Sequence, residues 1–234
     1  TKAERHLELM YKPHLTPRSA GEKGNNMNIT KKTHKELFDA VEFCRKARLT
    51  DASESYRPFY NSLEVKTGRL CATDGHRLHI QPTADLPDGV YDYTKKGSTV
   101  TLTKRDDNKY PDINVVMPRK HDHTVEVNHA ELLRICRQAL VMADKNYIGI
   151  HLTFNGHLEV RMTNPDLGEY HSETETSCAV EPECTTAINP RFIRDALTSF
   201  KGKTVTMKLQ SEAHKYPLVL QAGDKTALIM PMRI

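Results

Sequence analysis

Apolar residues recur at helical spacing in three segments of the chain, and each recurrence predicts one helix. In the first segment, Thr33 and Glu36 match a capping box, in which a hydroxyl and a carboxylate satisfy free backbone N–H groups. Leu37 and Val41 then follow on one face. The pattern therefore predicts a helix within residues 30–48.

The other two predicted helices begin at asparagines, which are favoured capping residues. Asn128 precedes a leucine-rich stripe, and the predicted helix extends over residues 129–145. Asn189 is followed by Pro190, a residue that suits the first position of a helix because its missing N–H would be unpaired there anyway. This third helix is expected within residues 190–203.

Short segments that alternate apolar and polar residues occupy most of the remaining chain and predict strands. Turn signals such as Asn155-Gly156 join them into hairpins. Residues 124–234 are predicted to form a βαβββ unit twice, whereas residues 28–105 supply one such unit and then a hairpin, without a second helix. The predicted fold class is α+β, with helices on one side of antiparallel sheets.

The composition is that of an ordinary soluble protein of one large or two modest domains, with 234 residues, 38% apolar and 27% charged. No apolar run approaches membrane-spanning length, so no membrane partner is expected. The five cysteines are scattered, which indicates neither a disulfide framework nor a zinc knuckle and favours a reduced, cytoplasmic setting.

The net charge of +4 is too small to indicate nucleic-acid binding by itself, but its distribution is uneven. Residues 30–48 contain six basic and three acidic residues, and residues 190–203 contain four basic and one acidic. Basic residues on the outer face of a helix are often only solvated. Alternatively, they contact the phosphates of a nucleic acid without recognising its base sequence. The candidate DNA-contacting residues are Lys32, Lys35, Lys46, Arg134, Arg137, Lys145, Arg191, Arg194 and Lys201.

No catalytic site, metal site or cofactor is predicted. The twelve histidines lack the spacing of a metalloprotease helix or a zinc finger, and His121 and His123 are expected in an exposed loop. Asp106 and Asp107 are adjacent, so in a strand they would point to opposite faces. The absence of Trp and the 6% aromatic content argue against stacking of single-stranded nucleic acid.

Two distant stretches are unusual, namely Ala-Thr-Asp-Gly-His-Arg-Leu at residues 72–78 and the apolar Ile-Met-Pro-Met-Arg-Ile at residues 229–234. Both resemble signatures of the bacterial DNA polymerase III sliding clamp, the β subunit. Residues 109–118 resemble the segment that enters the last domain of that family. The resemblance extends from about Asn28 to the end of the chain and is closer over residues 109–234.

The resemblance implies the DNA-clamp fold, with helices lining a hole for duplex DNA. It implies an abridged domain at residues 28–108, similar to the middle domain of the family, and a complete domain at residues 109–234, similar to its C-terminal domain. Residues 1–27 are expected to be an extension or a disordered tail. Because the first domain has one helix where the family has two, the form of assembly is left open between a homotrimer, a dimer and an open arc.

The resemblance also implies a groove that receives short linear peptides from polymerases, the clamp loader and repair proteins. The matching residues are Tyr60, Thr73, Gly75, His76, Arg77, Leu78, Pro111, Val116, Leu228, Met230, Pro231, Met232, Arg233 and Ile234. Val115 occupies a position where the family often has a basic residue, and Ile234 replaces the usual terminal Leu. Both differences bear on which partners would be preferred.

The predicted function is therefore that of a homo-oligomeric processivity factor, with no enzymatic activity, that tethers a DNA polymerase to duplex DNA in the nucleoid. Two alternatives remain. A clamp-like adaptor or decoy would bind partner peptides without encircling DNA, and a monomer in solution would favour it. A metal-dependent nuclease would cleave plasmid and lose that activity on substitution of Asp74 or Asp106.

Overall fold

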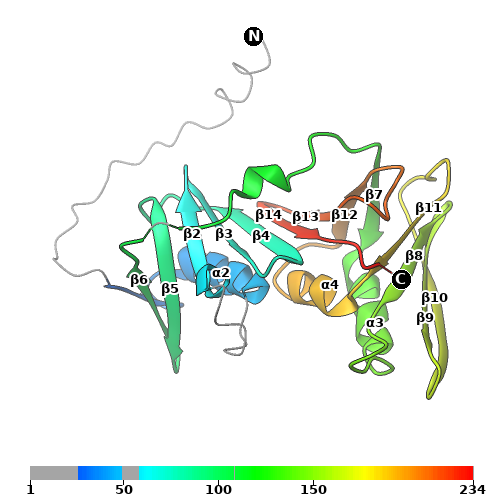
Figure 1. Ribbon diagram of the computed structural model, residues 1–234, viewed down its shortest axis with the longest axis horizontal. Coiled ribbons are helices and arrows are strands. Elements are labelled where there is room, and N and C mark those ends of the chain that lie inside the picture. The colour runs from blue at the N-terminus through cyan, green and yellow to red at the C-terminus, as the bar shows by residue number, and fades with distance from the viewer. Residues whose placement is uncertain (1–25, 49–57, 108, 234) are drawn as a thin grey trace, which may run out of the picture.

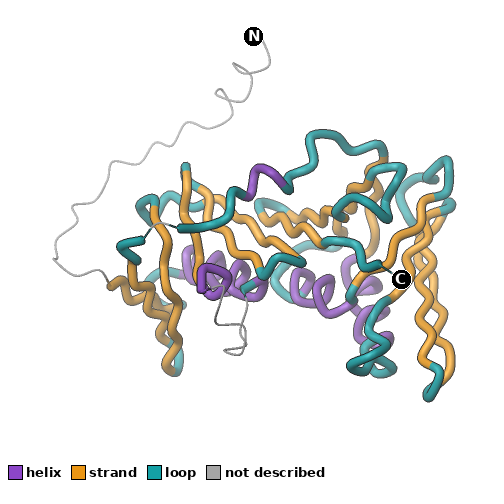
Figure 2. Tube along the Cα trace, in the orientation of Figure 1, coloured by secondary structure: helices purple, strands orange, loops and turns teal. Residues whose placement is uncertain are grey.

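The computed structural model describes residues 26–48, 58–107 and 109–233. The molecule is elongated, with α2 and α4 lying beneath a broad sheet (Figure 1), and strands contribute more residues than helices do (Figure 2). The predicted α+β class is confirmed. The first part of the predicted tail lies outside the described residues, but Asn26 and Met27 belong to a strand and pair with Thr103 and Leu102. The first strand therefore begins inside the segment that was predicted to be a tail, because Met27 packs against the core.

The strands of the described residues form two sheets, and every pairing in them is antiparallel. The larger has ten strands in the order β1 (Asn26–Thr30), β6 (Thr99–Lys104), β5 (Gly89–Lys96), β2 (Ser62–Lys66), β3 (Arg69–Thr73), β4 (Arg77–Pro82), β14 (Lys225–Ile229), β13 (Leu218–Ala222), β12 (Thr204–Leu209), β7 (His123–Asn128). The smaller has the order β10 (Gly168–Glu175), β9 (His157–Asn164), β8 (Ile150–Phe154), β11 (Cys184–Ile188).

The predicted double repeat in the second half of the chain is confirmed. Its units are β7-α3-β8-β9-β10 and β11-α4-β12-β13-β14, with α3 at His129–Ala139 and α4 at Pro190–Leu197. Each unit contributes its first strand to the sheet of the other, since β7 pairs with β12 and β11 pairs with β8. In the described residues of the first half, β5 and β6 form a direct hairpin without an intervening α-helix, as predicted.

Two of the three predicted helix starts are confirmed. The Asn128 side chain accepts a hydrogen bond from the N–H of Glu131 at 3.0 Å, and the Asn189 side chain accepts one from the N–H of Arg191 at 3.0 Å. The predicted capping box at Thr33 is wrong. Helix α2 (Lys35–Cys44) has His34 at its N-cap without a side-chain hydrogen bond, because the Thr33 hydroxyl bonds to Thr30 and His34 instead.

The main hydrophobic core fills the space between the helices and the sheets and is continuous through both halves of the molecule. A second, small cluster lies on the opposite face of the ten-stranded sheet. Its buried members are Cys71, Leu78, Ile80, Ile113, Val219 and Leu228. Because successive side chains of a strand point to opposite faces, the same few strands supply both clusters.

Candidate functional site

The two halves of the chain meet where β4 pairs with β14. Leu78 is opposite Leu228 in this ladder, and their side chains are only 3% and 2% exposed. The segment after β6 crosses the outer face of this junction and places Ile113, in the 3-10 turn η4 (Ile113–Val115), against them. The junction therefore has an apolar floor on the side away from the helices.

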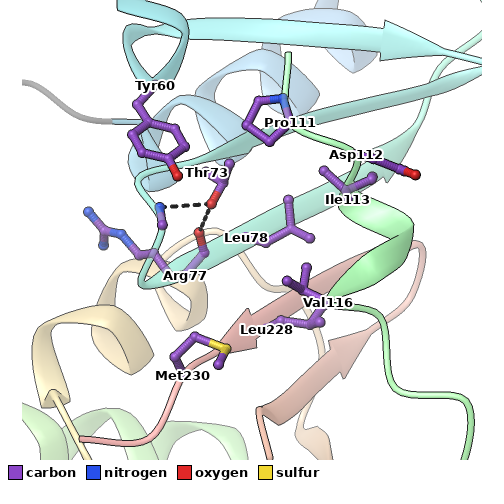
Figure 3. A pocket seen from close by; sticks show the side chains of 11 residues that line it. Tyr60, Thr73, Arg77, Leu78, Pro111, Asp112, Ile113, Val116, Leu228 and Met230 are labelled. Carbon is purple, nitrogen blue, oxygen red and sulfur yellow. Dashed lines mark hydrogen bonds between the residues drawn. The ribbon is translucent and has the colours of Figure 1, made fainter. Parts of the chain in front are cut away.

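The turn between β3 and β4 forms one wall of the site. The Thr73 hydroxyl donates to the carbonyl of Arg77 at 2.6 Å and accepts from the N–H of Gly75 at 3.0 Å (Figure 3). Asp74 accepts from the N–H groups of His76 and Arg77. These bonds satisfy the backbone of a tight turn, whose φ of +90° at Gly75 favours glycine.

Tyr60 closes the same wall from η3 (Pro58–Asn61). A Cβ atom at Gly75 would lie 3.3 Å from the Tyr60 hydroxyl, so the glycine lets the ring approach the turn. Tyr110 also stabilises the turn, because its hydroxyl accepts a hydrogen bond from the N–H of Thr73 at 3.0 Å. Burial raises the pKa of that hydroxyl well above its usual range.

These elements enclose a cavity of about 130 Å³, which is hereafter called the junction groove. Its lining residues are Tyr60, Thr73, Gly75, Arg77, Leu78, Pro111, Asp112, Ile113, Val116, Leu228 and Met230 (Figure 3). The cavity is smaller than the roughly 300–1,000 Å³ of typical small-molecule sites, so it suits a few side chains of a longer ligand.

Most of the residues predicted for the groove meet at this cavity, although they come from four distant segments. His76, Pro231, Met232 and Arg233 do not line it, and Ile234 lies outside the described residues. Asp112 and Ile113 were not predicted, because the resemblance over residues 109–118 supplied only Pro111 and Val116 for the groove. Asp112 in fact caps η4, since its carboxylate accepts from the N–H of Asn114 at 3.0 Å.

The chain after β14 is fixed by backbone bonds to both halves. The N–H of Met230 donates to the carbonyl of His76 at 2.9 Å, and the N–H of Met232 donates to the carbonyl of Ala187 at 2.7 Å. These bonds hold the Met230 side chain at the groove, and they give His76 a structural contact through its backbone.

Arg77 contributes only part of its chain to the groove, because its guanidinium points away from Leu78 and Val116 (Figure 3). The guanidinium bonds to Asp74 at 2.9 Å and to Asp195 of α4 at 2.6 Å, and it stacks over the Phe192 ring. Burial favours the neutral form of Asp195, but hydrogen bonds from Arg194 and Arg77 outweigh it and lower the pKa of this carboxyl.

A lysine extends this polar network on the helix side, and a buried histidine lies close to it. The Lys46 ammonium donates to the Asp195 carbonyl and to the hydroxyls of Thr198 and Ser199 at the C-terminal end of α4, where a positive charge is favourable. Nearby, the fully buried His79 ring stacks on Phe43 with centroids 4.4 Å apart.

The predicted DNA-contacting residues fall into two groups. Four are engaged within the protein: Lys46 as described, Arg134 with Glu131, Arg194 with Asp195, and Lys201 with Asp39. The other five are exposed and have no acidic partner among the residues that the structure describes: Lys32, Lys35, Arg137, Lys145 and Arg191.

Within the described ranges, no group of three or more His, Cys, Asp or Glu side chains has a geometry that would hold a metal ion. His121 and His123 are both partly buried rather than fully exposed. None of the helices in the described part of the chain is long and apolar enough to cross a membrane.

Comparison with known proteins agrees with this geometry. The family model for the C-terminal domain of the DNA polymerase III β subunit matches residues 114–233. The β sliding clamp of Pseudomonas aeruginosa is 24% identical over 89% of this chain, and that of Escherichia coli K12 is 22% identical over 86%. A crystal structure of the P. aeruginosa sliding clamp superposes with a TM-score of 0.71 at 22% identity and covers 94% of this chain.

The chain spans 66% and 64% of the length of these two relatives, and 69% of the crystallised chain. The structural likeness shows that the chain has the DNA-clamp fold in a shorter form.

Proposed function

This chain belongs to the DNA polymerase III β subunit family, and on that premise we propose that it is a processivity factor that tethers a polymerase to duplex DNA. It performs no chemistry itself. It raises the local concentration of its partner at the DNA, as a linked binding module does. The observation that carries the proposal is the apolar junction groove, built from the β3–β4 turn, η4 and the segment after β14.

The groove supports binding of a short extended peptide from the polymerase or the clamp loader. Its floor of Leu78, Leu228 and Ile113 is buried, so it is preformed rather than assembled on binding. Met230 forms its flexible edge, and a thioether side chain adapts to varied apolar partners. A few apolar anchors in such a groove are sufficient for recognition of a linear motif.

The test compares the full chain with a chain that ends at Ile229. The shortened chain retains all of β14 but lacks Met230 and the backbone bonds from Met230 and Met232. A fluorescent peptide of the family's clamp-binding type should bind the full chain, and its affinity for the shortened chain should be at least tenfold lower, with a similar melting temperature. Equal affinity for both chains would contradict the proposal.

Contact with DNA is the second part of the proposal. Each helix has one exposed basic residue that forms no ion pair with the described residues. These are Lys35 of α2, Arg137 of α3 and Arg191 of α4. Contacts of this kind with phosphate are independent of sequence and allow sliding.

Reversal of Lys35, Arg137 and Arg191 to Glu should weaken retention on circular duplex DNA. The slope of log affinity against log salt should fall by about 0.9 for each phosphate that the variant no longer neutralises. The matched control reverses Lys109, Arg119 and Lys120, which are exposed on the outer segment after β6. Equal weakening in both variants would indicate a general charge effect and would contradict DNA contact through the helices.

We further propose that residues 28–108 are an abridged domain, that residues 109–234 are a complete one, and that copies associate around DNA in the bacterial cytoplasm. The end strands β1 and β10 each have one free edge among the described strands. Glu169, Glu173 and Glu175 are exposed on β10, whereas Lys31 and Lys32 follow β1. Light scattering should give a multiple of 26.6 kDa. A monomer at micromolar concentration would instead favour an adaptor that binds peptides without encircling DNA.

A further inference from the structure

A second hollow adjoins the junction groove and is not part of it. It has a volume of about 510 Å³ and shares Val116 and Met230 with the groove. Its own surface comes from the segment after η4 and from the loop between β12 and β13. We call this hollow the basic shelf, after its residues Arg119, Lys120 and Lys215.

The shelf combines exposed apolar surface with positive charge. Val115, Val116 and Tyr216 are 82%, 44% and 42% exposed, so three of the six large exposed hydrophobic residues in the described chain border the shelf. Isolated exposed apolar side chains are normal, but a contiguous group on a folded protein indicates a contact surface.

No residue that lines the shelf is acidic. Lys215 bonds to Glu212 just outside it. Among the described residues, Arg119 and Lys120 form no direct ion pair, and the carboxylate whose charge Lys120 senses, Asp122, does not line the shelf. An occupant that matches this surface carries apolar groups next to negative charge. The continuity with the junction groove means that one extended chain can occupy both.

We propose that the basic shelf binds the flank of the partner peptide and selects partners in which Asp or Glu residues adjoin the apolar motif. This inference rests on the proposed function, because the apolar motif itself occupies the junction groove. Complementary charge at the rim of an interface adds specificity and speeds association more than it adds affinity, so the contribution depends on salt.

The experiment uses three fluorescent peptides with the same apolar motif and either neutral residues on both sides, two Asp on the N-terminal side, or two Asp on the C-terminal side. Anisotropy titrations are made with the full chain at 50 and 500 mM salt. One acidic peptide should bind about three- to tenfold more tightly than the neutral peptide at low salt, and most of this preference should disappear at high salt.

Two variants locate the effect. Arg119→Glu with Lys120→Glu should abolish the preference for the acidic peptide and leave the neutral peptide within about twofold. Lys66→Glu with Lys96→Glu makes the same charge change at the exposed ends of β2 and β5 and should preserve the preference. Loss of the preference in both variants would overturn the assignment to the shelf.

The outcomes separate the two proposals. Equal binding of all three peptides would overturn the role of the shelf and leave the junction groove intact as a peptide site. Failure of every peptide to bind would overturn the proposed function and the inference together.

Discussion

The two faces of the junction between β4 and β14 are held by different interactions. On the helix side, Arg77 joins Asp74 to Asp195, and Lys46 bonds to the end of α4. On the outer side, Leu78 and Leu228 pack under a short 3-10 turn and leave a cavity. Because alternate residues of one strand serve the two faces, the helix side can fix the junction while the outer side stays open for a ligand.

The comparison separates stability from binding. Substitutions on the helix side should lower the stability of the junction with little direct effect on the ligand surface. Substitutions on the outer side should weaken ligand binding with little effect on stability.

The largest effect is expected from acid acting on His79. Its Nδ1 lies 2.8 Å from the carbonyl of Phe43, which can only accept, so Nδ1 carries the proton and Nε2 is buried without a partner. Burial lowers the pKa of His79 to about 3 from an ordinary value of 6.5. The unfolded chain therefore takes up this proton first, and stability falls as pH decreases from 6.5 towards 3, by up to about 1.4 kcal/mol per pH unit.

Urea denaturation between pH 7 and 4 measures this dependence. His79→Phe, which keeps a ring to stack on Phe43, should remove most of the slope that His79 contributes. His214→Phe is the control, because His214 is exposed. An unchanged slope in His79→Phe would show that the buried imidazole is not responsible.

The ion pairs of Arg77 should give the next largest effect. Arg77→Ala leaves the Asp195 carboxylate with one guanidinium partner and removes the stacking on Phe192, so the free energy of unfolding should fall by about 2–4 kcal/mol. Arg161→Ala breaks an ion pair with Glu159 in which the guanidinium is mostly exposed, and it should destabilise the protein far less. Similar destabilisation in the two variants would contradict the special role of the helix side.

On the outer side, Val116→Ser should weaken peptide binding by about tenfold, or about 1.4 kcal/mol, because it removes an apolar wall of the groove. Its effect on unfolding should stay within about 0.5 kcal/mol, since Val116 is already partly exposed. Val141→Ser makes the same change on an exposed residue away from the groove and should alter neither quantity. Peptide anisotropy and thermal unfolding provide the two readings.

A smaller change is expected at the β3–β4 turn. Gly75→Ala strains a φ of +90° and pushes against the Tyr60 hydroxyl, so it should cost about 1 kcal/mol and lower peptide affinity by a few-fold. Gly156→Ala strains a φ of +104° in open space and should cost a similar amount without changing affinity. Equal peptide affinities in the two variants would show that Tyr60 and the β3–β4 turn do not contribute to peptide binding.

The sequence predicted local features well where one short pattern determines them. Asn128 and Asn189 cap their helices as expected, because the side-chain oxygen of each accepts from a free N–H group of the first turn. The capping box predicted at Thr33 was wrong, because the Thr33 hydroxyl bonds to the side chains of Thr30 and His34 instead. The turn in η4, with Asp112 and Ile113 in the groove, was missed because a single turn of 3-10 helix leaves no periodicity to read.

Long-range features could not be read from the sequence. The hydrogen bonds from Lys46 to Thr198 and Ser199 join residues that are far apart in the chain, and no local sequence pattern predicts them. For the same reason, the sequence suggested nine basic residues for DNA and could not indicate that Lys46, Arg134, Arg194 and Lys201 have internal partners. The resemblance to the clamp family supplied most groove residues, because it places distant segments together.

Binding at the outer face can be located directly by mapping amide chemical shifts on the labelled protein as an apolar clamp-binding peptide is added. Shifts are expected at Gly75, Ile113, Val116 and Met230, which line the outer side, with little change at Lys46 and Thr198 on the helix side. Shifts concentrated at Lys46 and Thr198, or no shifts at saturating peptide, would contradict the claim that the outer face of this junction is the binding site.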